Sequence, residues 1–403
     1  MSKLIFTLIC LSAFGGAIPC QARVITVDDD GPADFNNIQA AIDDSNNDDT
    51  IIVADGVYKG VGNRDINFKG KAIVVRSENG PEKCIINCNG ISHSYRKGFY
   101  FYNREDSNSI VDGFTITNSE TAIWCDQTSP TIINCTIKNN INGIRCWQSK
   151  AIIANCLIVG NSGKCNCLIY PYCMPKGVGI NCVESSPTIT NCTIADNSIK
   201  YWEGGVLCNR SSPIITNSII WGNSYSRDCI IDGNPHFPEG LCQIETLKGT
   251  KLEGNALVSY SNIQGGWSGK GNIDIEPFFA LPGYWDPNGT PNDLNNDFWV
   301  DGDYHLKSQA GRWDANEGRW TKDEVTSLCI DAGDPKSPIG LGPFPNGGII
   351  NMGAYGGTEE ASKSYFGEPV CETIVAGDIN GDCKVDFKDF AFMAFHWLED
   401  NNP

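Results

Sequence analysis

Histidine and methionine are scarce in this sequence of 403 residues, which contains four of each. The histidines are scattered along the chain, and we predict structural roles for all of them: His93, His236, His305 and His396. Long apolar runs are absent as well. The N-terminal run Leu4–Leu11 is too short for a membrane span, and no other segment is apolar enough to cross a bilayer.

Basic residues are also few, because 30 Lys and Arg stand against 48 Asp and Glu, which gives a net charge of −18. A surface with this charge repels nucleic acid and anionic lipid, so the sequence argues against both as partners. It also repels a polyanionic glycan, unless calcium or a local arginine bridges the two.

The N-terminus has the pattern of a signal peptide. Lys3 places a positive charge ahead of the apolar run, and Cys20-Gln-Ala22 supplies the small residues of a cleavage site. We therefore expect residues 1–22 to be removed and the protein to be secreted, to the extracellular space or the cell surface.

Cysteine, in contrast, is abundant: removing Cys10 and Cys20 with the signal leaves 17 of the 19. Disulfides are the default expectation in an exported chain, with zinc as the alternative at Cys165, Cys167 and Cys173. The odd number leaves at least one cysteine unpaired, and the repeats described next indicate that many are core residues.

The middle of the chain contains internal repeats. One element reads Ser-Pro-x-Ile-x-Asn-Cys-x-Ile, and a second reads Gly-Ile/Val-x-Cys. The second element and its variant give a cysteine column with steps of 21, 36 and 26 residues: Cys125, Cys146, Cys182 and Cys208. The asparagines of the first element keep the same steps: Asn134, Asn155, Asn191 and Asn217. Two columns in one register predict stacked coils.

Each repeat consists of short runs of alternating β-branched and polar residues, broken by Gly, Asn and Ser, with no helical period. We therefore predict an all-β fold, a right-handed parallel β-helix with one coil per repeat and coils ~4.8 Å apart. Asparagine tolerates the left-handed conformation of a sharp bend. The alternation directs the cysteine column inward, with some neighbours within disulfide reach, and directs Trp124 and Asp126 outward.

The start of the chain after the signal resembles a known family. Asn37-Ile-Gln-Ala-Ala-Ile42, followed by Asp49–Tyr58, is similar to the opening of pectin-lyase-like right-handed β-helix proteins. Within Phe35–Ser45 we predict a short amphipathic helix that caps the open end of the β-helix and turns Ile38, Ala41 and Ile42 inward.

The resemblance extends over most of residues 24–360. Segments 329–334 and 351–357 are similar to the closing coils of large exported β-helix proteins of environmental bacteria. The family resemblance implies the fold and a carbohydrate-directed activity in a groove on the outer face of one sheet.

The repeat register brings four outward residues together. Trp124 becomes a neighbour of Arg145, and Asp126 becomes a neighbour of Trp147. Aromatic rings stack on sugar CH groups, while a carboxylate and a guanidinium bind hydroxyls or carboxylates. These four residues are our predicted carbohydrate-binding site. The alternative is a mixed surface with two exposed tryptophans.

Catalytic residues stay unassigned. The paired aspartates, Gly-His-Gly and Arg-x-Lys signatures of polygalacturonase-type hydrolases are missing, and no acidic calcium cluster is grouped with an arginine base as in pectate lyases. Two interpretations therefore remain: a polysaccharide lyase or glycoside hydrolase, or a non-catalytic extracellular surface or adhesion protein that binds a polysaccharide through the solenoid.

Near the C-terminus, Asp378–Asp389 has the ligand spacing of a calcium loop of the EF-hand type. Oxygen-bearing side chains fall at positions 1, 3, 5, 9 and 12, and position 7 offers its backbone carbonyl: Asp378, Asn380, Asp382, Asp386, Asp389 and Lys384. A helical pattern follows. We predict one bound Ca²⁺ as cofactor, and a candidate disulfide between Cys371 and Cys383.

This loop resembles the dockerin module of bacterial cell-surface and polysaccharide-degrading systems, over about residues 371–400. The resemblance implies a cohesin-like or cell-surface protein partner, but dockerins normally carry two loops and only one complete loop is present. The helix residues Phe392, Met393 and Phe395 are predicted to pack on the end of the β-helix or on a partner.

The predicted organisation is a signal peptide at 1–22, a β-helix at 23–360, a linker at 361–370 and a dockerin-like module at 371–403. A second acidic loop, Asp293–Asp303, has oxygens at calcium-loop spacing but Tyr304 at the last position. Calcium binding and a plain solvated loop are equally good interpretations of it.

Overall fold

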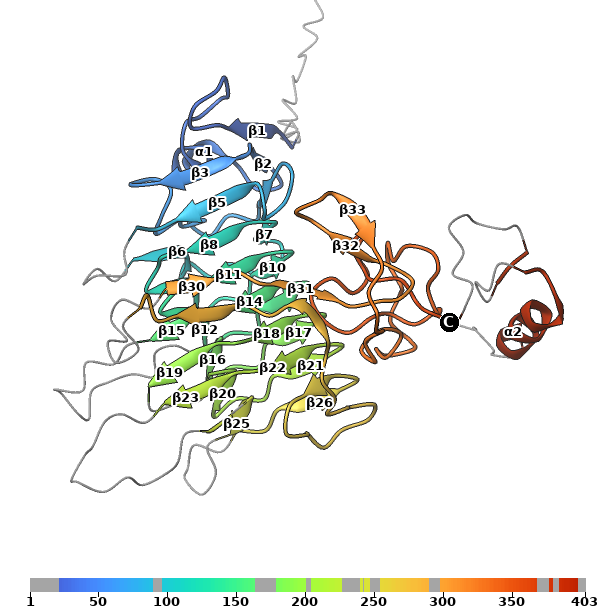
Figure 1. Cartoon of the computed structure of the whole chain (residues 1–403). Coiled ribbons are helices and arrows are strands. Elements are labelled where there is room, and N and C mark those ends of the chain that lie inside the picture. The colour runs from blue at the N-terminus through green and yellow to red at the C-terminus, as the bar shows by residue number, and fades with distance from the viewer. Residues whose placement is uncertain are drawn as a thin grey trace, which may run out of the picture.

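The strands stack into a parallel β-helix (Figure 1), as the repeats predict. The computed structural model describes residues 22–89, 96–163, 179–200, 204–226, 240–241, 243–246, 254–289, 298–367, 377–379 and 384–397. Residues 1–21 of the predicted signal peptide and the three clustered cysteines Cys165, Cys167 and Cys173 lie outside these ranges.

Three long parallel sheets form the walls of the solenoid. Sheet A contains β1 (Val24–Val27), β2 (Thr50–Val53), β4 (Val74–Ser77), β7 (Ile110–Asp112), β10 (Thr131–Ile133), β13 (Ile152–Ala154), β17 (Thr188–Thr190), β21 (Ile214–Thr216) and β26 (Leu257–Ser259). Sheet B contains β3 (Gly56–Lys59), β5 (Cys84–Asn87), β8 (Thr115–Thr117), β11 (Thr136–Lys138), β14 (Leu157–Val159), β18 (Thr193–Ala195), β22 (Ile219–Trp221) and β27 (Asn262–Ile263). Sheet C contains β6 (Lys97–Phe101), β9 (Thr121–Asp126), β12 (Asn142–Trp147), β16 (Ile180–Val183), β20 (Val206–Asn209) and β25 (Ile244–Thr246).

Shorter elements complete the fold. Sheet D contains β15 (Ser162–Gly163), β19 (Ser198–Lys200), β23 (Ser224–Ser226) and the antiparallel β24 (Gly240–Leu241). Three antiparallel pairs follow in the chain: β28 (Phe279–Leu281) with β31 (Asp303–Leu306), β29 (Tyr284–Asp286) with β30 (Phe298–Val300), and β32 (Arg312–Asp314) with β33 (Arg319–Thr321). The two described helices are α1 (Ile38–Asp44) and α2 (Phe387–Trp397).

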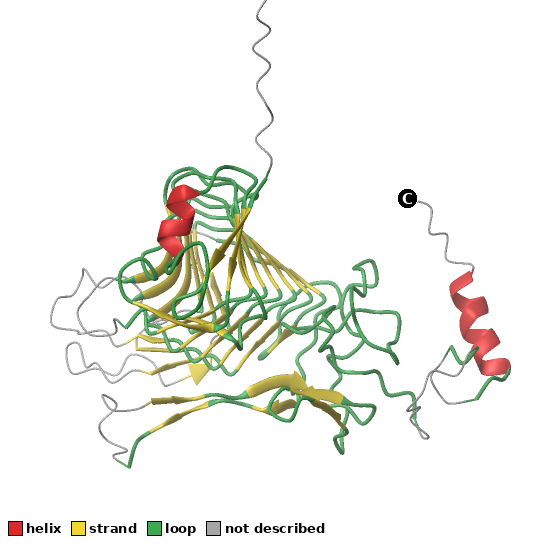
Figure 2. Cartoon of the chain, turned by 90° about the horizontal axis from the view of Figure 1, so that it is seen from above, coloured by secondary structure: helices red, strands yellow, loops and turns green. Residues whose placement is uncertain are grey.

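Helix α1 lies at the N-terminal end of the solenoid (Figure 2), which confirms the predicted cap. The side chain of Asn37 accepts a hydrogen bond from the N–H of Ala40 and so caps the first turn. Ile38, Ala41 and Ile42 are fully buried against the first coil. Their burial covers apolar residues that an open β-helix would otherwise expose.

Cysteines line the interior, as predicted. Cys125, Cys146, Cys182 and Cys208 are register partners on successive strands of sheet C, and all are fully buried. The ten cysteines among the described residues are free thiols, so the alternative of a disulfide between neighbouring coils is not adopted there. The column therefore contributes apolar packing rather than cross-links.

Polar ladders turn the corners between sheets. Asn134, Asn155, Asn191 and Asn217 all have φ near +50°, as expected at the bend between sheets A and B. A second ladder inside the solenoid was not predicted: Asn140, Asn161, Asn197 and Asn223 are buried, and each donates from its side chain to a buried acceptor on the next coil. Its steps are again 21, 36 and 26 residues.

The segment from β28 to Phe366 does not close further coils, in contrast to the expectation for 329–334 and 351–357. It packs sideways on the outer face of sheet B, where β30 and β31 cross the solenoid strands (Figure 1). The outward residues Leu157, Val159, Ala195 and Ile219 form a second core with Trp299, Tyr304, Leu306 and Met352 of this layer. Sheet B can accept such a layer because its outward positions in these coils are apolar.

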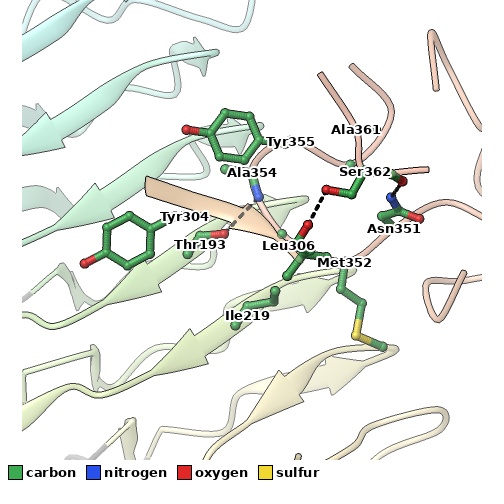
Figure 3. A pocket seen from close by; sticks show the side chains of 12 residues that line it. Thr193, Ile219, Tyr304, Leu306, Asn351, Met352, Ala354, Tyr355, Ala361 and Ser362 are labelled. Atoms are coloured by element: carbon green, nitrogen blue, oxygen red, sulfur yellow. Dashed lines mark hydrogen bonds between the residues drawn. The ribbon is translucent and has the colours of Figure 1, made fainter. Parts of the chain in front are cut away.

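Hydrogen bonds tie the layer to the coils. The N–H of Ala354 donates to Thr193 Oγ1 at 3.0 Å, and within the layer Ser362 Oγ donates to the carbonyl of Leu306 (Figure 3). Asn155 and Asn191 donate from their side chains to the carbonyl of Gly356. The cavity at this junction encloses only ≈ 10 Å³, about one water-sized sphere, so the junction is packed and is not a ligand site.

Buried charge reinforces the layer. The ring of His305 is nearly inaccessible, stacks on Tyr355 at 3.6 Å and contacts Asp303 at 2.6 Å. Arg312 pairs with Asp303 at 3.0 Å and Asp323 at 3.1 Å. His305 therefore has the structural role predicted for the histidines; His93 and His236 lie outside the described residues.

Candidate functional site

The outer face of sheet C brings the four predicted residues together. Trp124 on β9 is the register partner of Arg145 on β12, and Asp126 is the register partner of Trp147. The guanidinium carbon of Arg145 lies 4.6 Å from the centre of the Trp124 ring, a cation–π contact. The predicted juxtaposition is thus present, while its role in binding sugars stays a prediction.

Two tyrosines extend this face beyond the predicted residues. Tyr100 on β6 pairs in register with Trp124, and the two ring centres are 5.3 Å apart. Tyr102 follows, with its ring 4.4 Å from that of Tyr100, and is 48% exposed. The sequence contains a signal for them, because Gly98-Phe-Tyr-Phe101 replaces Gly-Ile-x-Cys in the same register. This coil was not recognised as a repeat because Phe101 stands where the other coils have the column cysteine.

Cations occupy the ring surfaces of this cluster. The ammonium of Lys97 lies 4.6 Å from the Tyr100 ring centre and 4.9 Å from that of Trp124. Burial lowers the pKa of Arg145, against the opposing charges of Glu120 and Asp126. Burial, followed by the nearby Asp126 carboxylate, raises the pKa of the Tyr100 phenol. The two cations are therefore matched by two carboxylates on the same face.

Several polar atoms on this face are buried and form no hydrogen bond among the residues that the structure describes: Trp124 Nε1, Asp126 Oδ1, Asn181 Oδ1 and Asn209 Oδ1. Asn181 is the register partner of Arg145, and Asn209 lies two strands beyond Trp147 in the other outward row. A buried polar group without a partner costs about 1–3 kcal/mol. Such groups concentrated on one outer face indicate a surface built to contact a polar ligand.

The C-terminal loop is described only in part. Asp378 and Asp389 are both buried, with 5% and 3% exposure. Asp389 accepts the N–H of Ile379 through Oδ1 and that of Asp386 through Oδ2, which draws the two ends of the loop together. Asp386 accepts the N–H of Lys388 and caps α2.

Carboxylates at both ends of the loop fit a Ca²⁺ ion, because carboxylate oxygens are the ligands that Ca²⁺ prefers. The remaining predicted ligands Asn380 and Asp382, and the cysteines Cys371 and Cys383, lie outside the described residues. Lys384 is the first described residue after this gap, and its carbonyl stays a predicted ligand.

The second acidic loop is also described in part, since Asp293, Asn295 and Asp297 lie outside the described residues. Asp301 pairs with Lys138 at 2.6 Å, and Asp303 belongs to the ion pairs of the lateral layer. Both carboxylates thus bind protein cations, which favours a structural role for this end of the loop.

One comparison with known proteins bears on the architecture. The model of the family described as "Right handed beta helix region" matches residues 71–257. The fold is accordingly a right-handed parallel β-helix. No curated protein matches the sequence. Among the described helices, none is long and apolar enough to cross a membrane.

Two solved structures are similar in shape. One is the crystal structure of pectate lyase Pel9A, with a TM-score of 0.43 and 14% identity over 82% of this chain and 96% of that chain. The other is an alginate lyase from Paenibacillus sp. str. FPU-7, with a TM-score of 0.35 and 14% identity over 60% of this chain and 87% of that chain.

Proposed function

We propose that the outer face of sheet C binds a glycan, and that this is an exported, carbohydrate-directed β-helix protein. The observation that carries the proposal is the continuous platform Tyr102–Tyr100–Trp124, which adjoins Arg145 and has Trp147, 37% exposed, in the neighbouring row. Rings in such a row stack on successive sugars, and the unpaired polar atoms around them hydrogen-bond to ring substituents.

Two forms of this function are compatible with the site. In the first, the protein is a polysaccharide lyase or glycoside hydrolase, and the sheet C face holds the chain that is cleaved. In the second, it is a non-catalytic surface or adhesion protein, and the face serves retention alone. Incubation with a panel of polysaccharides in the presence of calcium separates the two: release of reducing sugar or unsaturated uronate identifies an enzyme, and retention without release identifies the adhesion form.

The binding face is tested by replacing Trp124 and Trp147 together by Ala in the full chain. Retention on the polysaccharide that the wild type binds best should fall at least about tenfold, because each stacking contact contributes on the order of 1 kcal/mol. Tyr284→Ala is the matched control, since Tyr284 is an aromatic residue that is 53% exposed on β29, a strand that pairs with β30 and not with sheet C. Equal retention by the double variant and the control would contradict the proposal.

We also propose that the C-terminal loop binds one Ca²⁺ and that α2 attaches the protein to a cohesin-like or cell-surface protein. The buried Asp378 and Asp389 support the ion, because several carboxylates in one short loop repel each other without it. The exposed apolar residues Phe387, Phe390 and Met393 on α2, at 88%, 60% and 38%, support a protein partner.

Calorimetric titration with calcium tests the loop. The full chain should bind Ca²⁺, and the double variant Asp378→Asn/Asp389→Asn should lose one binding event. The acidic cluster Asp28–Asp30, whose carboxylates lie close together near the N-terminus, provides the control: Asp28→Asn/Asp30→Asn should retain that event. No binding at millimolar calcium, or loss in the control alone, would contradict this assignment.

A further inference from the structure

Most of the unpaired polar atoms on the sheet C face are hydrogen-bond acceptors. Asp126 Oδ1, Asn181 Oδ1 and Asn209 Oδ1 are buried and accept no hydrogen bond within the described part of the chain, and Trp124 Nε1 is a buried donor. Asn181 is only 3% exposed, and its side chain points outward from β16 in the row of Arg145. A ligand that satisfies this face must therefore donate at three places.

Sugar hydroxyls meet this demand and ionised carboxylates do not. A hydroxyl donates one hydrogen bond and also accepts, so it pairs with an amide oxygen, a carboxylate oxygen or an indole N–H. An ionised uronate carboxylate only accepts, so opposite Asn181 Oδ1 it would leave two acceptors facing each other. Sugar hydroxyls, and not a carboxylate, are therefore the groups expected opposite these three oxygens.

The charge of the sheet C face also favours a neutral ligand. Lys97 and Arg145 lie on the ring of Trp124, and the Glu120 and Asp126 carboxylates act on the Arg145 charge, so the formal charges of the four cancel. The whole chain carries −18, and this field repels a polyanion at long range. A sugar that stacks on Trp124 replaces one of the two cations on the ring and needs no charge of its own.

We infer that the sheet C face recognises a neutral, hydroxyl-rich oligosaccharide whose hydroxyls donate to Asp126, Asn181 and Asn209. The inference rests on the proposed glycan-binding function and adds the substrate class. From β9 to β20 the face crosses three strand spacings of ~4.8 Å, about 14 Å in all, which is longer than a single sugar ring. The ligand is therefore an oligosaccharide that runs along the solenoid axis.

The test compares two ligand classes on the full-length protein by calorimetry. Neutral cello-, manno- and xylo-oligosaccharides form one class and oligogalacturonate the other, each at low and high salt. At least one neutral ligand should bind more tightly than the uronate, with an affinity nearly independent of salt because no ion pair is formed.

A variant tests the role of Asn181. Asn181→Leu should weaken neutral binding about five- to tenfold, because it removes one acceptor. The thermal midpoint of this variant should stay equal or rise, because a buried unpaired group is lost. Thr190→Leu, on the outward side of sheet A, is the control and should leave binding unchanged.

The outcomes test the ligand class separately from the proposed glycan-binding function. Tighter, salt-sensitive binding of oligogalacturonate that depends on Trp124 and Trp147 would overturn the neutral substrate class and leave the proposed function standing. Neutral binding unaffected by Asn181→Leu would overturn the role of Asn181. Binding of neither class, or binding indifferent to both tryptophans, would overturn the proposed function together with the inference.

Discussion

The outer faces of sheets B and C are built from the same coils, but a second layer of the chain covers only the face of sheet B. On sheet B most outward residues of β14, β18 and β22 are apolar and are covered by the lateral layer, and the polar Thr193 and Asn191 find hydrogen-bond partners there. On sheet C the outward residues are aromatic or polar, and buried atoms of Trp124, Asp126 and Asn181 find no partner among the described residues. A covered face with satisfied polar groups stabilises the fold, whereas a face with unpaired groups is suited to a ligand.

The contrast follows from side-chain chemistry, because the strands themselves are alike. Leu157 and Ile219 on sheet B gain free energy by burial against a second layer. Trp124 and Arg145 on sheet C occupy positions of the same kind, but their polar ends favour contact with polar partners. Three changes to single residues break or sharpen this comparison.

The largest effect is expected at Trp299, which closes the layer over sheet B. It is 9% exposed, and its ring lies so close to Gly160 that a Cβ on that glycine would be 2.3 Å from the ring. Trp299→Ala should destabilise the layer by about 3–5 kcal/mol, because a large buried ring leaves a cavity. Chemical denaturation and limited proteolysis of the layer measure this. A loss below about 1 kcal/mol would mean that the layer does not depend on its apolar contact with sheet B.

A smaller effect is expected at Asp196, a carboxylate next to β18 that links sheet B to the layer through Tyr304. Its Oδ2 accepts the Tyr304 hydroxyl at 2.5 Å, and burial raises its pKa to about 6. Because the folded-state pKa lies above the unfolded one, the contribution of Asp196 is largest below about pH 4 and is lost as pH rises through about 6.

Asp196→Asn keeps an acceptor for Tyr304 and removes the titration. At about pH 7 it should stabilise the protein by up to about 3 kcal/mol, and the gain should vanish below about pH 4. Urea denaturation of both proteins at the two pH values measures the difference. A gain that is the same at both pH values would show that the Asp196 charge does not oppose the covered face.

Features that repeat from coil to coil could be predicted from the sequence, whereas contacts between segments far apart in the chain could not. The inward cysteines and the left-handed Asn134 column follow from motifs within one coil, and their equal spacing gave the register that joins Trp124 to Arg145. The inner ladder of Asn140 shares that spacing and was open to the same reasoning. The lateral layer was not, because Asn155 and Gly356 are 201 residues apart and no local pattern encodes their contact. Tyr100 was missed for a third reason, the loss of the cysteine from its coil.

The smallest effect is expected at Trp147, which is the counterpart of Trp299 on the open face. Trp147 is 37% exposed, so its replacement by Ala leaves no closed cavity and should change stability by about 1 kcal/mol or less. A saturating glycan should raise the thermal midpoint of the wild type, since it binds only the folded state, and should raise that of Trp147→Ala by less. Differential scanning calorimetry with and without the glycan measures both shifts. If Trp147→Ala instead destabilised the ligand-free protein as strongly as Trp299→Ala, the outer face of sheet C would be a structural surface like that of sheet B, and the difference between the two faces would disappear.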